Sequence, residues 1–500
     1  MQSKIDCIFS MRRLRFMNIK KVFDTDQDKE IRSIMFDSRK KNPDSIFFAM
    51  KGKINDGHRF IDQAIDNGAI VIVYTDEIEN RREGIVYIKV EDATLAYVSF
   101  CNAFYDYPTE KMNTIGITGT NGKTTIAWII RSLVAHFDKC GYIGTMGYYY
   151  GEKISNSSLN LTTPKSDELF RIGKEMTDYG CRVLVLEASS EGLLTHRLDQ
   201  VHFTTAVFNN LTSDHMDIHH DMESYFKAKQ ILFDMLDKDA KAIINIDDPY
   251  GLRLMEQCNS IKITYALEND ADYKAENVSL YNDHSEFDLI HEGKKYHIST
   301  NLLARFNIYN LLAVIAVLNE NGYELERILP YLDHLDTTPG RCQMIDAGQE
   351  FNVVIDYAFT PNSFEKVFAF AKSITGDNKR IIAVFGASGD RDHLRRPGTA
   401  VIADREADQV ILTYDDPSTE DMMDILKEMK TYFKRLDPEI ILDRYEAIQK
   451  AVTLAKEGDT ILLLGKGNDE FFLDKNGRIP YISDKVAAEK AIELKKKGKI

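Results

Sequence analysis

Long apolar runs are missing from this sequence of 500 residues. No stretch approaches the roughly 20 consecutive apolar residues that a helix needs to cross a bilayer. The N-terminal segment has charges on both sides of a short apolar patch, and it lacks the apolar core and small-residue cleavage site of a secretory signal. We therefore expect a cytoplasmic protein with no segment inserted in a membrane.

Cysteine pairs are missing as well. The six cysteines are scattered along the chain, and none stands in a CxxC arrangement. Disulfide frameworks and zinc sites both require cysteines at characteristic spacings. The cysteine pattern therefore indicates free thiols in a reducing compartment.

The sequence also lacks an excess of basic residues. It contains 63 lysines and arginines against 78 aspartates and glutamates, which gives a formal net charge of −15. Proteins that bind nucleic acids through the phosphate backbone need a basic surface. We therefore expect no nucleic-acid partner, whereas a small basic pocket for a phosphorylated metabolite is compatible with this charge.

What the sequence does contain is an alternation of short β-rich runs with amphipathic helical stretches. This alternation is typical of α/β proteins, in which crossover helices join parallel strands. Because a chain of this length exceeds one ordinary hydrophobic core, we predict three domains, at residues 1–108, 109–338 and 339–500. The third domain is predicted to be doubly wound, with strands at residues 352–356, 380–385, 409–413 and 460–464.

A glycine-rich segment lies between an apolar strand and a buried helix, and it reads Gly119-Thr120-Asn121-Gly122-Lys123-Thr124-Thr125. Glycines let the backbone N–H groups turn toward an anion, and the helix N-terminus adds a partial positive charge. Lys123 supplies a full charge, and a threonine hydroxyl can reach magnesium. The segment therefore predicts a central ATPase-like domain that binds ATP with Mg²⁺. A strict Walker pattern has glycine where this chain has Ile117, so a glycine-rich turn without a ligand is the alternative.

Glu187 ends another apolar run, at residues 182–186. Ligands of open α/β sheets gather at the carboxyl ends of strands, and a carboxylate there can hold the Mg²⁺ that accompanies ATP. We favour this metal role over the alternative, in which Glu187 caps a helix or lies on the surface.

Residues 208–220 combine two aspartates with three histidines, including Asp214 and His215. Such density could form a transition-metal site. The same residues could instead form a loop that orients one magnesium ligand and caps the next helix. Zinc is not indicated in particular, because no cysteine or HExxH spacing accompanies the histidines.

Taken together, these segments resemble the Mur ligases, the bacterial family that builds the peptide of the cell wall. The resemblance covers essentially the whole chain in the family's order, and it is carried by TGTNGKTT (118–125), LEASS (186–190), NLTSDHMD (210–217), RFNIYN (305–310), GR (340–341), DYA (356–358) and GDRD (389–392). Residues 37–39, 56–57, 162–164 and 415–417 are similar to the members that add the third amino acid.

The resemblance implies a three-domain ligase that activates a carboxylate as an acyl phosphate with ATP and Mg²⁺. An amine would then attack this intermediate and form an amide. The substrates would be UDP-N-acetylmuramoyl-L-alanyl-D-glutamate and a diamino acid, and the protein would be a monomer.

The resemblance also assigns the site residues. The uridine nucleotide would be bound by Ser38, Lys53, Ile54, Asn55 and Asp56, and the muramoyl peptide by Thr162, Thr163, Ser189, Thr195 and Arg197. ATP would be bound by residues 119–125, with Asn307 and Asn310 near the adenine and Arg341 near the phosphates. The metal ligands would be Thr124, Glu187, His215 and Lys229, the last as a carbamate. Without the resemblance, Lys229 reads as an ordinary solvated lysine on a helix.

The choice of amino acid is predicted from Asp415-Asp416-Pro417-Ser418. Members that take meso-diaminopimelate have a DNPR motif here, and its arginine grips the distal carboxylate. This chain lacks the arginine, and Asp416 adds a negative charge that would suit the ε-ammonium group of L-lysine. We therefore expect L-lysine, with meso-diaminopimelate or ornithine as alternatives. Arg396 would hold the α-carboxylate, and Gly465 and Asp469 would contact the incoming amino acid.

Glu191, Phe359 and Asn468 stand where the family pattern has histidines. These replacements leave a divergent paralogue as an alternative. A folylpolyglutamate or cyanophycin-type ligase shares the central fold, but the separate N-terminal domain counts against the first of these. A catalytically silent nucleotide-binding scaffold or regulator is an alternative of a different class, and a transport or motor ATPase is a third.

Overall fold

The computed structural model describes residues 16–52, 55–155, 161–391 and 394–500. The chain divides into two compact units. The first unit comprises Met1–Ile115 and Asp138–Thr204, and the second comprises Gly116–Phe137 and Thr205–Ile500. Within the described ranges, we find no helix with the length and apolar character needed to cross a membrane.

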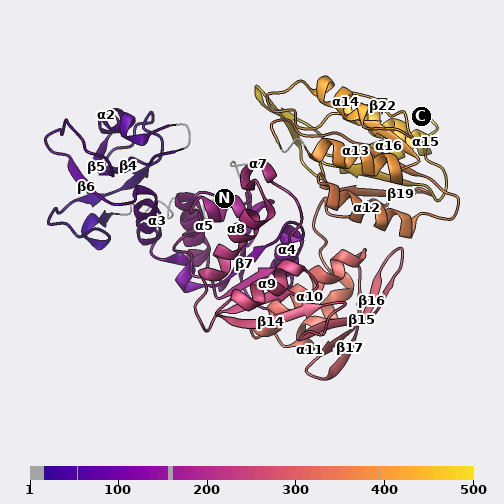
Figure 1. Cartoon of the computed structure of the whole chain (residues 1–500), viewed down its shortest axis with the longest axis horizontal. Helices are drawn as coiled ribbons and strands as arrows, with labels where there is room; N and C mark the ends of the chain where they lie inside the picture. The colour runs from indigo at the N-terminus through magenta and orange to yellow at the C-terminus, as the bar shows by residue number, and fades with distance from the viewer. Residues whose placement is uncertain (1–15, 53–54, 156–160, 392–393) are drawn as a thin grey trace, which may run out of the picture. The chain divides into compact units, whose positions relative to one another are not determined.

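The first unit begins with a parallel sheet in the order β3-β4-β5-β6. Its strands are β3 (Ser33–Met35), β4 (Ser45–Phe48), β5 (Ala69–Tyr74) and β6 (Val86–Lys89), and a ribbon of β1 (Met17–Asn18) and β2 (Glu30–Ile31) precedes them. Helices α2 (Ile61–Asp66) and α3 (Ala93–Phe104) both pack on β5 (Figure 1). Strand β4 is buried along its whole length and β5 along most of it, which is typical of parallel strands covered by helices.

The rest of the first unit contains strands in the order β10-β9-β8-β11. These are β8 (Cys140–Gly144), β9 (Gly147–Tyr150), β10 (Lys153–Ser155) and β11 (Val183–Glu187), with helices α5 (Ser166–Tyr179) and α6 (Ser190–Leu194). Strands β8 and β11 are parallel, so the carboxyl end of β11 places Glu187 at the edge where ligands of such sheets bind.

Strand β7 (Asn113–Thr118) crosses the boundary between the units and leads into α4 (Lys123–Val134) of the second unit. Within that unit the strands that follow β7 lie in the order β12-β13-β14-β15-β16-β17. They are β12 (Thr205–Phe208), β13 (Lys241–Asn245), β14 (Ile261–Ala266), β15 (Tyr273–Leu280), β16 (Ser285–His291) and β17 (Lys294–Thr300). Pairing is parallel from β12 to β15 and antiparallel from β15 to β17.

Helix α10 (Arg305–Glu320) forms the centre of this part of the second unit. It packs against α4 and against β12 to β15, which explains why its residues from Asn310 to Leu318 are buried on every side. The other helices here are α7 (Met216–His219), α8 (Met222–Asp234), α9 (Pro249–Gln257) and α11 (Leu325–Ile328).

The C-terminal lobe (residues 343–496) is a six-stranded sheet in the order β18-β19-β23-β20-β21-β22. The strands are β18 (Gln343–Met344), β19 (Asn352–Asp356), β20 (Ile381–Phe385), β21 (Gln409–Leu412), β22 (Glu439–Ile440) and β23 (Thr460–Leu464), and only β18 is antiparallel to its neighbour. The lobe also contains a hairpin of β24 (Phe471–Asp474) and β25 (Gly477–Pro480).

Helices cover both faces of this sheet. One hydrophobic cluster joins the sheet to α12 (Pro361–Ile374), α13 (Arg395–Glu406) and α14 (Met422–Thr431). A second cluster joins it to α15 (Arg444–Leu454) and α16 (Asp484–Lys496). The lobe is therefore doubly wound, and the four strands predicted from the sequence are present.

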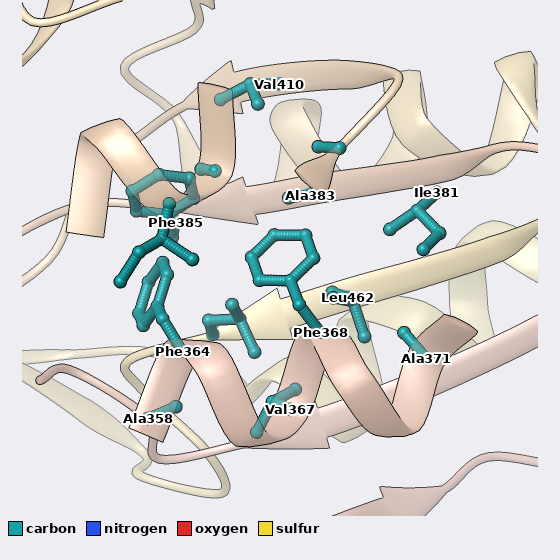
Figure 2. Packing of buried hydrophobic residues seen from close by; sticks show 14 of the residues in the cluster. Ala358, Phe364, Val367, Phe368, Ala371, Ile381, Ala383, Phe385, Val410 and Leu462 are labelled. Atoms are coloured by element: carbon teal, nitrogen blue, oxygen red, sulfur yellow. The ribbon is translucent and has the colours of Figure 1, made fainter. Parts of the chain in front are cut away.

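The sequence of α12 explains both its start and its packing. Thr360 and Ser363 form a capping box, and Pro361 occupies the first helical position, where a missing N–H costs nothing. Phe364 and Phe368 recur at helical spacing and point at the sheet (Figure 2). The ring of Phe364 meets Phe385 of β20 edge-on, with centroids 5.0 Å apart.

The α/β fold, with a glycine-rich turn between β7 and α4 and a doubly wound C-terminal lobe, agrees with the sequence prediction. The residue boundaries of the predicted domains stay a prediction.

We expect Phe368→Ala to lower the free energy of unfolding by about 3–5 kcal/mol, because the ring is 1% exposed and its removal leaves a cavity. The measurement is urea unfolding followed by circular dichroism. Val401→Ala, at a site on α13 that is 50% exposed, is the control and should change this free energy by less than about 0.5 kcal/mol. Equal effects of the two changes would contradict the packing described here.

Candidate active site

The phosphate loop is the turn between β7 and α4, at residues 119–122. Gly122, directly before α4, has a φ of 89°, which L side chains rarely adopt. A Cβ atom on Gly122 would lie 2.3 Å from Asn209 Nδ2 and 2.4 Å from Asn310 Oδ1. Only glycine therefore fits at this position, and the loop leads directly into the N-terminus of α4, where backbone N–H groups can bind an anion.

A network of buried carboxamides holds the loop in place. Asn209 Nδ2 donates to the carbonyl oxygen of Asn121 (2.9 Å) and to Asn310 Oδ1 (3.0 Å). Asn210 accepts from the Asn121 N–H through Oδ1 (2.9 Å) and donates to the Asn121 carbonyl through Nδ2 (3.1 Å). Asn310 Nδ2 in turn donates to Asn307 Oδ1 (2.9 Å). Asn307 and Asn310 thus lie beside the loop, while their predicted contact with adenine stays a prediction.

Two lysines point at the same loop. Lys123 Nζ donates to the carbonyl oxygens of Gly119 (2.7 Å) and Thr120 (3.0 Å). Lys229 Nζ, from α8, donates to the Gly119 carbonyl (2.9 Å) and lies over the ring of Tyr225. Lys229 is 1% exposed, so its reading as a solvated lysine is wrong. Burial, together with the charge of Lys123, holds the pKa of Lys229 well below its usual range, which favours the neutral amine.

Asp214 and His215 follow β12 and lie at the contact between the central part of the second unit and the C-terminal lobe. Arg395 donates to Asp214 Oδ1 through Nη2 (2.6 Å) and Nε (3.1 Å). His215 Nε2 lies 3.4 Å from Asp214 Oδ2. Burial lowers the pKa of His215, which favours the neutral imidazole that metal ions bind.

The C-terminal lobe also reaches the phosphate loop directly, because Asn121 Nδ2 donates to Asn362 Oδ1 on α12 (3.3 Å). Next to these contacts lies a cavity of about 340 Å³. Its lining consists of Thr212, Ser213, Asp214, Pro361, Asn362, Glu365, Leu394, Arg395 and Ile402. The loop, the lobe and the cavity therefore form one site within the second unit.

The transition-metal alternative for residues 208–220 finds no support. His219 stacks on Tyr225 with ring centroids 4.5 Å apart, and burial lowers its pKa to about 4. In the ranges that the structure describes, the potential ligands that gather in a group of three are instead Asp56, His58 and Asp76.

In the first unit, Glu187 is fully buried at the end of β11. Its Oε1 accepts from the Tyr142 hydroxyl (2.5 Å) and the Thr145 N–H (3.0 Å), and its Oε2 accepts from Thr145 Oγ1 (3.1 Å). These bonds fix the direction of a carboxylate at a strand end. Tyr142 and Thr145 were not predicted from the sequence.

The residues predicted to hold the muramoyl peptide gather around Glu187. Thr163 Oγ1 donates to the Glu187 carbonyl oxygen (2.8 Å) and lies 2.9 Å from Ser189 Oγ. Thr162 Oγ1 lies 3.2 Å from Thr145 Oγ1, and Arg197 Nη1 donates to the Thr163 carbonyl (3.2 Å). The fifth predicted residue, Thr195, is at the end of α6, and its Oγ1 donates to the Glu191 carbonyl oxygen (2.6 Å). The structure therefore brings Thr162, Thr163, Ser189 and Arg197 together, while the side-chain hydrogen bond of Thr195 stays within the end of α6.

The uridine loop is only partly described, since Lys53 and Ile54 lie outside the described residues. Ser38 Oγ donates to Gln63 Oε1 (2.8 Å), and the Asn55 carbonyl accepts from the Gly52 N–H (2.9 Å). His58 Nδ1 lies 2.7 Å from Asp56 Oδ1, and its Nε2 accepts from the backbone N–H groups of residues 75 and 76 (both 3.2 Å). His58 therefore ties this loop to the end of β5, and its ring nitrogens already have protein partners.

In the C-terminal lobe, the segment predicted to select the amino acid is built around a buried lysine. Lys466, 1% exposed, donates to Asp416 Oδ1 (2.9 Å) and Oδ2 (3.1 Å), and its Nζ lies 3.4 Å from Asp469 Oδ2. Asp415 is buried beside Gly465, and burial together with the charge of Asp416 raises its pKa to about 6. Pro417 and Ser418 complete the segment, and the Ser418 N–H donates to the Leu473 carbonyl (3.0 Å).

The two arginines predicted to bind substrate or ATP here already have protein partners. Arg396 donates to Glu420 Oε1 and Glu428 Oε2, both at 2.7 Å. The guanidinium of Arg341 lies 4.8 Å from the centre of the Tyr357 ring. Their contacts with the α-carboxylate and with phosphate stay predictions.

Three family models match the chain in consecutive segments. They describe a Mur ligase family catalytic domain at residues 30–105, a Mur ligase middle domain at residues 117–318 and a Mur ligase glutamate ligase domain at residues 340–467. The UDP-N-acetylmuramoyl-L-alanyl-D-glutamate–2,6-diaminopimelate ligase 1 of Clostridium acetobutylicum is 38% identical over 473 residues, 94% of this chain and 96% of that protein. The chain belongs to the Mur ligase family.

Other relatives agree with this membership. The corresponding diaminopimelate ligase of Clostridium botulinum is 36% identical over 94% of this chain and 97% of that protein. A solved structure of a UDP-N-acetylmuramoyl-L-alanyl-D-glutamate–2,6-diaminopimelate ligase has a TM-score of 0.69 at 27% identity, covering 96% of this chain and 100% of that chain. A MurF ligase from Thermotoga maritima, in complex with ADP, shares the fold with a TM-score of 0.61 at 18% identity, covering 93% and 97% of the two chains. The protein is an ATP-dependent amide ligase, so the alternatives of a scaffold or regulator and of a transport or motor ATPase are wrong.

The expectation of L-lysine is not confirmed, because the similar ligases of Clostridium acetobutylicum and Clostridium botulinum are named for diaminopimelate. The structure supplies a physical reason. The prediction treated Asp416 as a free anion, but Lys466 neutralises it from within the lobe. A lysine and an aspartate 50 positions apart in the sequence gave no local sign of this pair.

Each residue that replaces a family histidine has a defined partner. Glu191 pairs with Arg197 (2.6 Å), and Asn468 donates to Gln343 Oε1 (2.8 Å). The guanidinium of Arg395 lies 4.7 Å from the centre of the Phe359 ring. Each replacement therefore has a partner within its own unit.

The sequence interpretation did not predict that Asn209 and Asn210 hold the phosphate loop in place. Their signal was present, since two carboxamides directly follow the apolar strand β12. Which loop they would face depends on the order of strands in the sheet, and the sequence does not state that order.

We expect Asn209→Ala to weaken ATP binding about tenfold, because the change removes one of the two donors to the Asn121 carbonyl and leaves Asn310 Oδ1 without the carboxamide that donates to it. Isothermal titration with a non-hydrolysable ATP analogue measures the dissociation constant. Asn319→Ala, which removes a similar carboxamide bonded to Tyr273, is the control and should leave the affinity unchanged. Unchanged affinity in a folded Asn209→Ala variant would refute the role assigned to this network.

Proposed function

We propose that this Mur ligase joins meso-diaminopimelate to UDP-N-acetylmuramoyl-L-alanyl-D-glutamate in the cytoplasm, as a monomer. Relatives that match it over nearly their whole length are named for this reaction. The observation in this chain that supports the amino acid is the pairing of Asp416 with Lys466. Because Lys466 bonds both oxygens of Asp416, that carboxylate already has a cationic partner within the lobe, and it no longer gives a reason to prefer lysine.

The phosphates of ATP would be bound by the backbone N–H groups at residues 119–125. Lys123, now bonded to the Gly119 and Thr120 carbonyls, would turn to the phosphates when they arrive. Its charge would offset the negative charge that builds up as the substrate carboxylate attacks the γ-phosphoryl group. The products of this step are ADP and an acyl phosphate on the substrate.

Magnesium fits the residues at hand. Carboxylate and hydroxyl oxygens suit this ion, and in the second unit Thr124, His215 and a carbamate on Lys229 would hold it. Glu187, in the first unit, stays a predicted ligand. Bound Mg²⁺ would supply positive charge to the phosphates. The buried, neutral amine of Lys229 is the form that can react with carbon dioxide to give the carbamate.

The second step is attack of a neutral amine on the acyl phosphate, which yields the amide and phosphate. Water would compete with the amine, so the site has to be closed while the intermediate exists. The bonds from Asn121 to Asn362 and from Asp214 to Arg395 hold the C-terminal lobe against the phosphate loop. These contacts support a role of the lobe both in presenting the amine and in excluding water.

The test of the function offers UDP-N-acetylmuramoyl-L-alanyl-D-glutamate, ATP and Mg²⁺ with meso-diaminopimelate, L-lysine or L-ornithine in separate reactions. Phosphate release and product mass should show the diaminopimelate adduct, with kcat/KM at least about tenfold above the other two amino acids. Lys123→Ala should abolish turnover. A preferred lysine adduct would refute the choice of meso-diaminopimelate but not the ligase reaction. Absence of phosphate release and of product with all three amino acids would refute the proposed dipeptide substrate and favour a divergent paralogue.

We expect Lys466→Met to shift the preference from meso-diaminopimelate toward L-lysine by about tenfold, because Asp416 would then lose its cationic partner. Competition of the two amino acids, resolved by product mass, gives this ratio directly. The double variant Asp416→Asn/Lys466→Met is the matched control, since it restores the original net charge of the segment and should keep the original preference. Identical ratios in the single and double variants would show that the charge of Asp416 plays no part.

A further inference from the structure

We infer that Glu191 is an internal competitor of the substrate, because its carboxylate occupies the arginine that would otherwise bind a carboxylate of the muramoyl dipeptide. This inference rests on the proposed function for the identity of that substrate. Glu191 stands where the family pattern has histidine. Its carboxylate would weaken the binding of the muramoyl dipeptide in this chain.

The geometry of Arg197 carries the inference. Its Nη2 donates to Glu191 Oε1 at 2.6 Å, and its Nη1 donates to the Thr163 carbonyl at 3.2 Å. The arginine side chain is only 13% exposed, whereas that of Glu191 is 46% exposed. The guanidinium is thus fixed within the protein, while the carboxylate that covers it reaches solvent.

The surroundings show that the arginine is built into the site and that the glutamate side chain alone is free to leave. Ser166 Oγ donates to the Arg197 carbonyl oxygen, and Thr163 ties this segment to Ser189. The backbone of Glu191 lies in the first turn of α6, where its carbonyl oxygen accepts from Thr195. Release of Arg197 therefore requires only a change of the Glu191 rotamer, with no movement of the helix.

The substrate has what is needed to displace Glu191. A terminal glutamate carries two carboxylates, and only one of them becomes the acyl phosphate. The other keeps its charge and needs a cation, for which the planar guanidinium is the best match among side chains. Binding then exchanges one carboxylate for another at Arg197, so the gain in free energy is smaller than it would be at an unoccupied arginine. A neutral histidine at position 191 would not compete in this way.

The experiment compares the full-length protein with Glu191→Gln and Glu191→His. We expect the KM for the muramoyl dipeptide to fall about three- to fivefold in both variants, with the change in KM rather than in kcat, because an ion pair of this exposure contributes that much to occupancy. Titration calorimetry without ATP should show the same fall in the dissociation constant. Asp178→Asn, which removes an acid paired with Lys174 at the far end of α5, is the matched control and should change neither value.

A second ligand tests the chemical basis. In the D-isoglutamine analogue, an amide replaces the carboxylate that is not activated, so the gain in affinity from Glu191→Gln should vanish. An unchanged or raised KM in Glu191→Gln, or an equal gain with the amide, would overturn the inference and make Glu191 a residue that orients Arg197. Absence of turnover in the unmodified protein would overturn the proposed reaction instead, and the calorimetric comparison would still decide the role of Glu191.

Discussion

A backbone can bind phosphate through its N–H groups only while it stays curled, and in this chain the carboxamide of Asn209 keeps residues 119–122 in that shape. The side chain reaches the loop at Asn121 and α10 at Asn310, so one buried residue connects the strand that ends at Phe208 with the helix that fills the centre of the unit. The absence of a side chain at Gly122 is the complementary requirement, since any Cβ would displace these carboxamides. The positions of Lys123 and Lys229 follow, because both bond to carbonyl oxygens of the same loop.

Charge compensation is the second theme of the site. The C-terminal lobe buries Lys466, Arg396 and Arg444, and each of them has carboxylates within bonding distance. Removing one partner from such a pair leaves a buried charge, which costs far more than the pair gains. An acidic residue in the sequence therefore does not predict the net charge around a bound ligand, because a basic residue of the same lobe can neutralise it.

The parts of the structure that could be predicted from the sequence are those with local causes. Alternating apolar runs and helices gave the strands of the C-terminal lobe nearly to the residue, and the glycine-rich segment gave the loop at the start of α4. The muramoyl-peptide residues were assigned through the family resemblance, and the structure gathers four of the five, namely Thr162, Thr163, Ser189 and Arg197. The pairing of Asp416 with Lys466 and the burial of Lys229 depend on which elements lie side by side, so they could not be read from spacing. The prediction that L-lysine is the added amino acid was not confirmed, because it did not take the Asp416–Lys466 pair into account.

The C-terminal lobe closes both of its hydrophobic cores almost entirely with its own residues. One cluster lies wholly between Ile345 and Ile492, and the buried members of the other that come from outside the lobe are Leu303, Ala304 and Cys342. A lobe that supplies nearly all of its own core has the main requirement of an independently folding domain. Its bonds through Asn362 and Arg395 then make attachment to the phosphate loop a step distinct from the folding of the lobe.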